Sequence, residues 1–178
     1  MSDDEEVVKW VARDGPMEST NMIVYRDSVV QIPLNRVEIK RLDKGLPLPK
    51  YESAGAAGID LYATKDVSIF STNTHATIVP TGIAVAIPVG YEAQIRSRSG
   101  LAAKESVMVL NSPGTIDSDY RGEIQVIMRK IGPGVYNIKR GDRIAQMVIS
   151  TVASAQLIEV DELDETVRGD GKFGSTGS

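Results

Sequence analysis

The chain has 178 residues, a length that favours one domain with a core of its own. It has no cysteine and one histidine, which excludes a disulfide scaffold, a thiolate or clustered-imidazole metal site and a histidine-based catalytic triad. The formal net charge of −4 argues against general nucleic-acid binding, no apolar run approaches the roughly 20 residues that span a bilayer, and the acidic start is unlike a signal peptide, so a cytoplasmic protein is expected.

Residues 1–35 are interpreted as an N-terminal extension. They combine an acidic start with an apolar run at Val7–Val11 and sustain no period. Val7, Val8 and Val11 could line a short helical stripe, but a flexible or loosely docked segment is the favoured prediction. The role of the extension is open, and contact with a protein partner is one candidate.

From Val37 onward, short apolar or alternating segments separated by Gly and Pro predict β-strands. Because only 5% of the residues are aromatic, the core between these strands must be aliphatic. The predicted strands are 37–42, 59–63, 67–70, 77–79, 82–87, 91–96, 107–110, 124–128, 134–138, 143–151 and 156–160. A helical turn or two is predicted at 100–105. This pattern predicts an all-β sandwich or barrel over residues 36–163.

Three segments that contain glycine also contain an arginine, although the protein is acidic overall. Arg98, the Ser99 hydroxyl and the free N–H groups of a helix start would form an anion site, and a solvated, capped loop fits the same residues equally well. Gly141–Gln146 is a turn that enters a strand, and taken alone it favours a plain turn with Arg143 in a surface ion pair. Together with Arg168, the three arginines suit a polyphosphate ligand.

Residues 111–124 lie between two predicted strands and predict a hairpin with an elaborate tip. Pro113, Gly114 and Gly122 supply turn geometry. Taken alone, an ordinary polar hairpin loop is the simpler interpretation, since Asp and Ser are common in turns.

The Gly/Ser-rich tail, residues 164–178, should be mobile in isolation. A disordered terminus is one interpretation. The other is a tail that closes on a ligand, because Phe173, one of two phenylalanines, could stack on a base while Arg168 and backbone amides hold phosphates.

Five segments, taken in order, resemble the five motifs of the trimeric dUTPase family: 57–63, 98–102, 114–124, 141–146 and 168–177. The resemblance covers the chain from Val37 to its C-terminus. It implies a distorted jelly-roll-like β fold and a homotrimer whose active sites are each built from more than one chain, with the tail closing as a lid. It also implies hydrolysis of dUTP to dUMP and pyrophosphate with Mg²⁺, which limits uracil in DNA and supplies dUMP for dTMP synthesis.

The resemblance implies a role for each matching residue. Asp117 would be the catalytic general base that activates a water for attack on the α-phosphate. The phosphates and waters would hold Mg²⁺, and Asp60 and Gln146 would act on it through water, with no direct protein ligand. The implied substrate-binding residues are Arg98, Ser99, Gly100, Asn111, Gly114, Thr115, Ile116, Tyr120, Gln125, Gln146, Arg168, Phe173, Gly174 and Ser175.

Specificity follows from the same resemblance. Tyr120 would pack on the deoxyribose and exclude the 2′-hydroxyl of UTP. The hairpin backbone, with Asn111, would recognise uracil and reject dTTP and dCTP, because a mismatch leaves buried polar groups unpaired. Arg168 would meet the γ-phosphate and Phe173 would stack on uracil.

The chain departs from the family pattern at two positions. Ser97 stands where the family often has Pro, and Lys172 where it often has Gly.

Two alternative functions are less well supported. A dCTP deaminase shares the fold but is disfavoured by the intact hairpin and tail. A nucleotide-sensing module that signals through residues 1–35 is less simple than hydrolysis, since Asp117 and Phe173 are both present.

Overall fold

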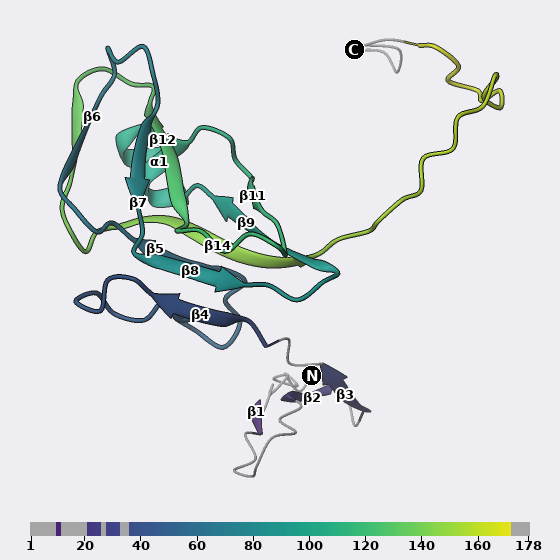
Figure 1. Ribbon diagram of the computed structural model, residues 1–178, viewed down its shortest axis with the longest axis horizontal. Helices are drawn as coiled ribbons and strands as arrows, with labels where there is room; N and C mark the ends of the chain where they lie inside the picture. Colours follow the sequence, from purple (N-terminus) through teal and green to yellow (C-terminus); the bar gives the residue numbers. More distant parts are fainter. Residues whose placement is uncertain (1–9, 12–20, 26–27, 33–35, 172–178) are drawn as a thin grey trace, which may run out of the picture.

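Short antiparallel strands build the part of the chain that the computed structural model describes, residues 10–11, 21–25, 28–32 and 36–171 (Figure 1). The strands are β1 (Trp10–Val11), β2 (Asn21–Tyr25), β3 (Ser28–Ile32), β4 (Glu38–Arg41), β5 (Ile59–Tyr62), β6 (Val67–Phe70), β7 (Thr77–Pro80), β8 (Ile83–Ala86), β9 (Tyr91–Arg96), β10 (Val107–Val109), β11 (Gly114–Ile116), β12 (Gln125–Lys130), β13 (Val135–Ile138) and β14 (Arg143–Thr151). One helix, α1 (Ser99–Glu105), occurs among these residues. The all-β prediction and the helical turn at 100–105 are confirmed.

Ten of the predicted strands form within two residues of their expected bounds, and one prediction is wrong. No strand forms at Gln156–Val160, where every residue is exposed. The reason is that this segment meets no strand edge within the described part of the chain, so alternation alone cannot stabilise it. Of the helical stripe considered near the N-terminus, Val7 and Val8 lie outside the described residues, and Val11 belongs to strand β1.

A four-stranded sheet with the order β11-β9-β14-β5 runs through the middle of the fold. Beside it are the three-stranded sheet β10-β12-β7 and the pairs β13-β6 and β4-β8, while β1-β2-β3 forms a separate sheet in the N-terminal extension. The predicted hairpin is present as β10 paired with β12, with Val107 opposite Lys130. The residues inserted in this hairpin contribute β11, which pairs with β9 of the four-stranded sheet.

The core is aliphatic, as the composition predicted. Alternation on β12 shows why, since Val126, Met128 and Lys130 are buried and the residues between them are partly exposed. Each fully buried aliphatic side chain contributes about 1.5–3 kcal/mol. The largest fully buried side chains in the described part of the chain are Leu61, Ile69, Ile124, Met128, Ile138, Ile144, Val79, Val107, Val109 and Val126.

A β-bulge interrupts the pairing of β14 with β5. Arg143 lies opposite Tyr62 and Ala145 lies opposite Leu61, so one extra residue, Ile144, is inserted between them. In a regular strand Arg143 would point to the face opposite Gln146, whereas the extra residue turns it onto the same face as Gln146 and Asp60. The bulge also explains why consecutive residues Ile144 and Ala145 are both buried.

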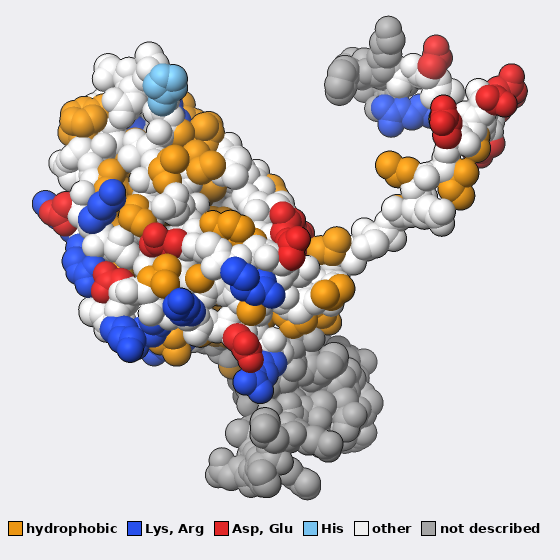
Figure 2. All heavy atoms as spheres, viewed as in Figure 1, with side chains coloured by type: hydrophobic (Ala, Val, Ile, Leu, Met, Phe, Trp, Pro, Cys, Tyr) orange, Lys and Arg blue, Asp and Glu red, His pale blue; other side chains and the backbone are white. Residues whose placement is uncertain are grey.

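The chain after β14 leaves the sheets and runs away from them (Figure 1). Its acidic side chains gather along this tail (Figure 2), and its apolar residues Leu157 and Leu163 are exposed. His75 lies in an exposed loop. Within the described ranges, no helix has the length and apolar character needed to cross a membrane.

Candidate active site

Asp60 on β5 is the centre of a cluster formed by Asp60, Arg98, Arg143 and Gln146, called here the Asp60 cluster. Its two carboxylate oxygens accept hydrogen bonds from Arg98 Nε at 2.9 Å and Arg143 Nη1 at 3.1 Å. Arg98 Nη1 also donates to the backbone carbonyl of Arg143 at 2.9 Å. The Asp60 side chain is 16% exposed. Its charge-assisted bonds fix both guanidinium groups, which stay partly open to solvent.

Gln146 joins this cluster from the neighbouring strand. It lies opposite Asp60 on β5 and opposite Arg96 on β9. Its Nε2 donates to the carbonyl of Ser97 at 2.9 Å, which ties the cluster to the loop before α1. Gly58 packs so closely that a Cβ there would come within 2.5 Å of Gln146 Oε1, so a side chain at this position would displace the Gln146 amide from the cluster.

The loop and helix after β9 carry Arg98, Ser99 and Gly100. Arg98 occupies the N-cap position of α1 and makes no side-chain capping bond. Ser99 and Gly100 are exposed, and a Cβ added at Gly100 would meet no atom within 4 Å. Backbone and hydroxyl donors at the start of α1 therefore face open space beside the Arg98 guanidinium.

Residues 111–124, called here the hairpin insert, form a second group. Gly114 is buried at the start of β11, and a Cβ there would lie 3.0 Å from Asn111 Nδ2, so the Asn111 side chain rests on the backbone of this turn. Asp117 follows directly after β11 and is exposed. The tip is tightened by a bond from the Tyr120 N–H to the Asp117 carbonyl at 3.1 Å.

The ring of Tyr120 is held by its own loop. Its hydroxyl donates to the Glu123 carbonyl at 3.0 Å, and a Cβ at Gly122 would lie 2.4 Å from that hydroxyl oxygen. Arg121 Nη1 donates to the carbonyls of Ser118 at 2.6 Å and Tyr120 at 2.8 Å. The ring and the tip are therefore braced by local contacts.

A hollow of about 280 Å³ lies beside the hairpin insert. It is lined by Ile78, Thr115, Ile116, Asp117, Tyr120, Glu123, Gln125 and Ile127. Five of these residues belong to the insert, and three come from the outward face of β7 and β12. An apolar wall with a carboxylate and an aromatic ring at its rim suits a flat, polar-edged ligand.

The Asp60 cluster and the hairpin insert lie apart within one chain. On β9, Ala93 pairs with Ile116 and Ile95 pairs with Gly114, so the two strands run in opposite directions. About 10 Å of strand separates Ala93 from Arg96, and Asp117 and Arg98 lie beyond opposite ends of that stretch. A single copy of the chain therefore does not bring Asp117 to the Asp60 cluster.

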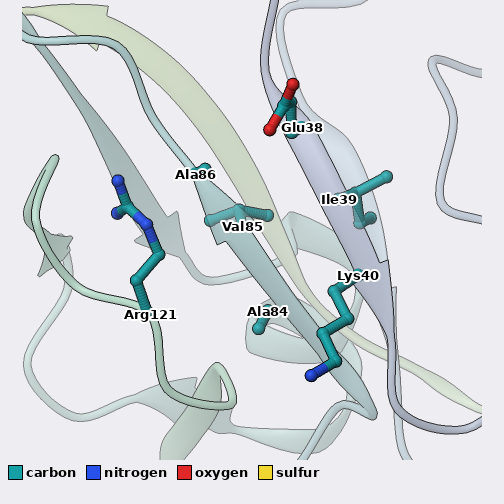
Figure 3. Close-up of a pocket in the computed structure, with 7 residues that line it drawn as sticks. All are labelled: Glu38, Ile39, Lys40, Ala84, Val85, Ala86 and Arg121. Atoms are coloured by element: carbon teal, nitrogen blue, oxygen red, sulfur yellow. The ribbon is translucent and has the colours of Figure 1, made fainter.

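A second hollow of about 390 Å³ lies over β4 and β8 (Figure 3). It is lined by Glu38, Ile39, Lys40, Ala84, Val85, Ala86 and Arg121. None of these residues belongs to the Asp60 cluster, and Arg121 reaches toward β8 from the hairpin insert (Figure 3). This hollow contains none of the residues predicted for the site.

Burial and hydrogen bonds shift the pKa values of Tyr136 and of two aspartates. Burial raises the pKa of the Tyr136 phenol, and the nearby carboxylates of Asp142 and Glu105 add to that increase. Outside the cluster, a hydrogen bond from Arg140 lowers the pKa of Asp43, and one from Lys139 lowers the pKa of Asp66.

The donor set in the described part of the chain does not form a cage for a metal ion. No group of three or more His, Asp or Glu side chains comes together there. Both oxygens of Asp60 already accept bonds from arginines. These residues fit an ion whose ligands come mainly from substrate and water, which is how Mg²⁺ is commonly held beside phosphates.

Known proteins resemble this chain in sequence and in fold. A family model described as dUTPase matches residues 44–177. The chain is 51% identical over 144 residues to the deoxyuridine 5'-triphosphate nucleotidohydrolase of Zymomonas mobilis, covering 80% of this chain and 97% of that protein. The protein of the same name from Anaplasma marginale is 52% identical over 145 residues, covering 80% of this chain and 99% of its own.

The chain belongs to the dUTPase family. The dUTPase of Staphylococcus bacteriophage 80alpha with bound dUpNHpp matches this fold with a TM-score of 0.74 and 26% identity, covering 82% of this chain and 100% of that one. A mutant dUTPase of phage phi11 of S. aureus, in which a structural Mg(II) ion is coordinated, has a TM-score of 0.66 and 23% identity over 72% of this chain and 98% of its own, and supports the fold alone.

For this dUTPase, the predicted site residues fall into three sets. One set is brought together around Asp60: Arg98, Ser99, Gly100 and Gln146. A second lies in or beside the hairpin insert: Asn111, Gly114, Thr115, Ile116, Asp117, Tyr120 and Gln125. Arg168 is exposed on the tail, and Phe173, Gly174 and Ser175, like Lys172, lie outside the described residues.

Sequence reasoning missed the partner of Arg143 and two side chains of the hollow. Arg143 was considered both for a surface ion pair and for a polyphosphate site, and its partner proves to be Asp60 of the site itself. Ile127 lines the hollow beside the hairpin insert, and its place two residues after Gln125 on an alternating strand could have revealed it. Ile78 could not have been found in this way, because the pairing of β7 with β12 leaves no local signal.

Proposed function

We propose that this chain hydrolyses dUTP to dUMP and pyrophosphate, with Asp117 as the general base. The observation that carries the proposal is the division of its polar residues into an arginine-based anion site and a braced hairpin with a carboxylate at the rim of a hollow. Membership of the dUTPase family supports the substrate. This activity would limit uracil in DNA and supply dUMP for dTMP synthesis, and a cytoplasmic location stays a prediction.

In this proposal the hairpin insert binds the deoxyuridine part of the substrate. Backbone groups of Gly114–Ile116 and of Gln125, with the Asn111 side chain, would read the edge of uracil. The Tyr120 ring, held by its hydroxyl bond to the Glu123 carbonyl, would cover the sugar and leave no room for a 2′-hydroxyl. Rejection of UTP then depends on the rigidity of this ring.

The Asp60 cluster binds the phosphates. Arg98, Ser99 and Gly100 would donate to phosphate oxygens, and Asp60 would keep the Arg98 guanidinium in place. Asp117 would accept a proton from a water as the water oxygen attacks the α-phosphorus. The bond from that phosphorus to the bridging oxygen breaks, and pyrophosphate leaves with the bonding electrons.

Magnesium would be held by the triphosphate and by water, with Asp60 and Gln146 hydrogen-bonded to those waters. When bound, the ion supplies charge neutralisation of the phosphates. The protein side chains orient the nucleotide and hold the proton of the attacking water.

We infer a homotrimer with shared active sites. Support comes from the separation of Asp117 and Arg98 along β9, because an Asp117 of one copy must then act on phosphates held by another. The tail would complete the site, with Arg168 at the γ-phosphate, Phe173 on uracil, and Gly174 and Ser175 at phosphates. A protein partner for residues 1–35 stays a candidate.

The decisive test is pyrophosphate release from dUTP, dCTP, dTTP and UTP with Mg²⁺. We expect turnover of dUTP alone, and Asp117→Asn should lower it by roughly 10³-fold while nucleotide binding is retained. Asp161→Asn, which removes an exposed carboxylate between β14 and the tail, is the matched control and should keep the full rate. Absence of turnover with every nucleotide, in a folded trimer, would favour the nucleotide-sensing alternative.

The tail assignment has its own test. Deletion of residues 168–178 should abolish turnover while the trimer survives in size-exclusion chromatography with light scattering, because the tail would close the site without building the interface. Truncation after Ser175 keeps every proposed tail contact and should be nearly neutral. Full activity of the longer deletion would refute the lid.

A further inference from the structure

Among the residues that the structure describes, Lys130 is the one charged residue that is buried, with 7% of its surface exposed. It is the last residue of β12 and continues the core-facing row of Val126 and Met128. The desolvation of a buried ammonium group is unfavourable unless hydrogen bonds compensate it. A lysine at this position therefore requires a structural reason.

Its contact supplies that reason. Lys130 Nζ donates to the backbone carbonyl of Glu105 at 2.6 Å. Glu105 is the last residue of α1, and the final carbonyls of a helix lack partners within the helix and carry partial negative charge. The ammonium group thus satisfies an unpaired carbonyl where a cation is electrostatically favoured.

Few contacts hold the body of α1, apart from the bonds of Arg98 to Asp60 and to the Arg143 carbonyl at its start. None of its residues is buried, and no side chain caps its N-terminus. Leu101 is its partly buried contact with the core. At its C-terminal end, Ser106 adopts a left-handed conformation with φ of 52° and accepts a bond from the Ile131 N–H at 2.9 Å. The C-terminal end of α1 is thus fixed to the end of β12 by two adjacent residues.

The opposite end of α1 is the part that would meet substrate. Arg98, Ser99 and Gly100 precede or begin the helix, and seven residues of helix span about 10 Å. Because α1 is short and rigid, a tilt at Glu105 would move the phosphate donors at its opposite end. In enzymes a misplacement of about 1 Å can cost roughly 100-fold in rate.

We propose that Lys130 is a positioning residue for phosphate binding, which sets the orientation of α1 and thereby the placement of Arg98, Ser99 and Gly100. The proposal rests on the proposed function, because those residues matter only if they bind the substrate phosphates. It predicts that loss of the ammonium group weakens binding of the β- and γ-phosphates and leaves binding of the nucleoside part unchanged.

The test compares two ligands on three variants by isothermal titration calorimetry. The ligands are dUpNHpp, which carries the whole triphosphate chain, and dUMP, which lacks the β- and γ-phosphates. Lys130→Met should weaken dUpNHpp roughly tenfold and change dUMP less than about twofold. Lys130→Arg keeps a charged donor and should restore most of the dUpNHpp affinity. Lys104→Met changes an exposed lysine of the same helix and should leave both affinities unchanged.

A purely structural role would weaken both ligands equally, and that result in a folded Lys130→Met protein would overturn the proposal, as would no change in either ligand. If Lys130→Met does not fold, Lys130→Gln replaces it, because its shorter neutral side chain falls short of the Glu105 carbonyl. An unchanged ratio of the two affinities in that variant would also overturn the proposal. Failure of the wild-type protein to bind dUpNHpp would instead refute the proposed function.

Discussion

The Asp60 cluster and the hairpin insert are organised in opposite ways. Hydrogen bonds in the cluster join residues that are 38, 45 and 83 positions apart in the chain. Those that brace Tyr120 and Arg121 in the insert join residues three positions apart or closer. The cluster therefore depends on the sheet, while the tip of the insert, residues 117–123, is braced mainly by local bonds. The base of the insert is joined to the sheet through β11 and through the bond from Gly82 N–H to Glu123 Oε1 at 2.8 Å.

This difference predicts that substitutions in the two regions will affect activity and stability differently. Substitutions in the cluster should lower both activity and global stability, because its bonds connect β5 and β14 with the loop that follows β9. Substitutions in the tip of the insert should alter recognition of the nucleoside and leave the free energy of unfolding nearly unchanged.

Among the substitutions that test this comparison, the largest effect is expected from Asp60→Asn. The substitution removes the charge that pairs with Arg98 and Arg143, so both guanidinium groups lose their orientation. We expect kcat/KM for dUTP to fall about 100-fold and the free energy of unfolding in urea to fall by about 1–2 kcal/mol. Asp43→Asn breaks a comparable pair with Arg140 outside the site and should leave turnover unchanged. Full activity of the Asp60 variant would contradict the cluster assignment.

A smaller effect, confined to specificity, is expected from Gly122→Ala. The new methyl group would lie 2.4 Å from the Tyr120 hydroxyl, so the ring must move. The ratio of kcat/KM for dUTP to that for UTP should fall about tenfold, with little change in urea stability. Gly55→Ala is the control, since a Cβ there meets nothing within 4 Å. An unaltered ratio would mean that Tyr120 does not exclude the 2′-hydroxyl.

The smallest effect concerns acid stability at a corner outside both regions. Hydrogen bonds from Lys139 and from the Arg140 N–H lower the pKa of Asp66 below its ordinary value of 3.8. A carboxyl group with a lowered pKa stabilises the fold above the ordinary value, and this contribution is lost as the pH falls through the lowered one. Asp66→Asn should therefore flatten the decline in thermal midpoint below about pH 4, with dUTP turnover at neutral pH unaffected. A decline as steep as in the wild type would exclude this contribution.

Most of the fold was predictable because period-two alternation is a local signal. The strands of the β core other than β11, and the turn at 100–105, follow from patterns a few residues long. Gln156–Val160 shows the limit, since it alternates in the same way but has no strand edge to join in the described chain. Alternation predicts the capacity to form a strand, while pairing decides whether one forms.

The site was predictable through its motifs and less so through its connections. The resemblance named Asp60 and Arg98 but gave no indication that Asp60 binds two arginines at once. Lys130 escaped notice because a lysine at the end of an alternating strand looks like a solvated residue. Its burial depends on the placement of α1 over β12, which is a tertiary property.

The extra residue in β14 has a consequence for how this region can vary. The side of the sheet on which Arg143 projects depends on whether Ile144 stays outside the regular pairing, so it is a matter of phase. If Ile144 were paired as an ordinary strand residue, both polar side chains would remain in the sequence and yet the guanidinium would project on the surface opposite Gln146. Deleting Ile144 would keep Arg143 and Gln146 on one face but would remove the bulge and a buried side chain. For Gly141–Gln146, pairing register is therefore inherited information as much as residue identity is.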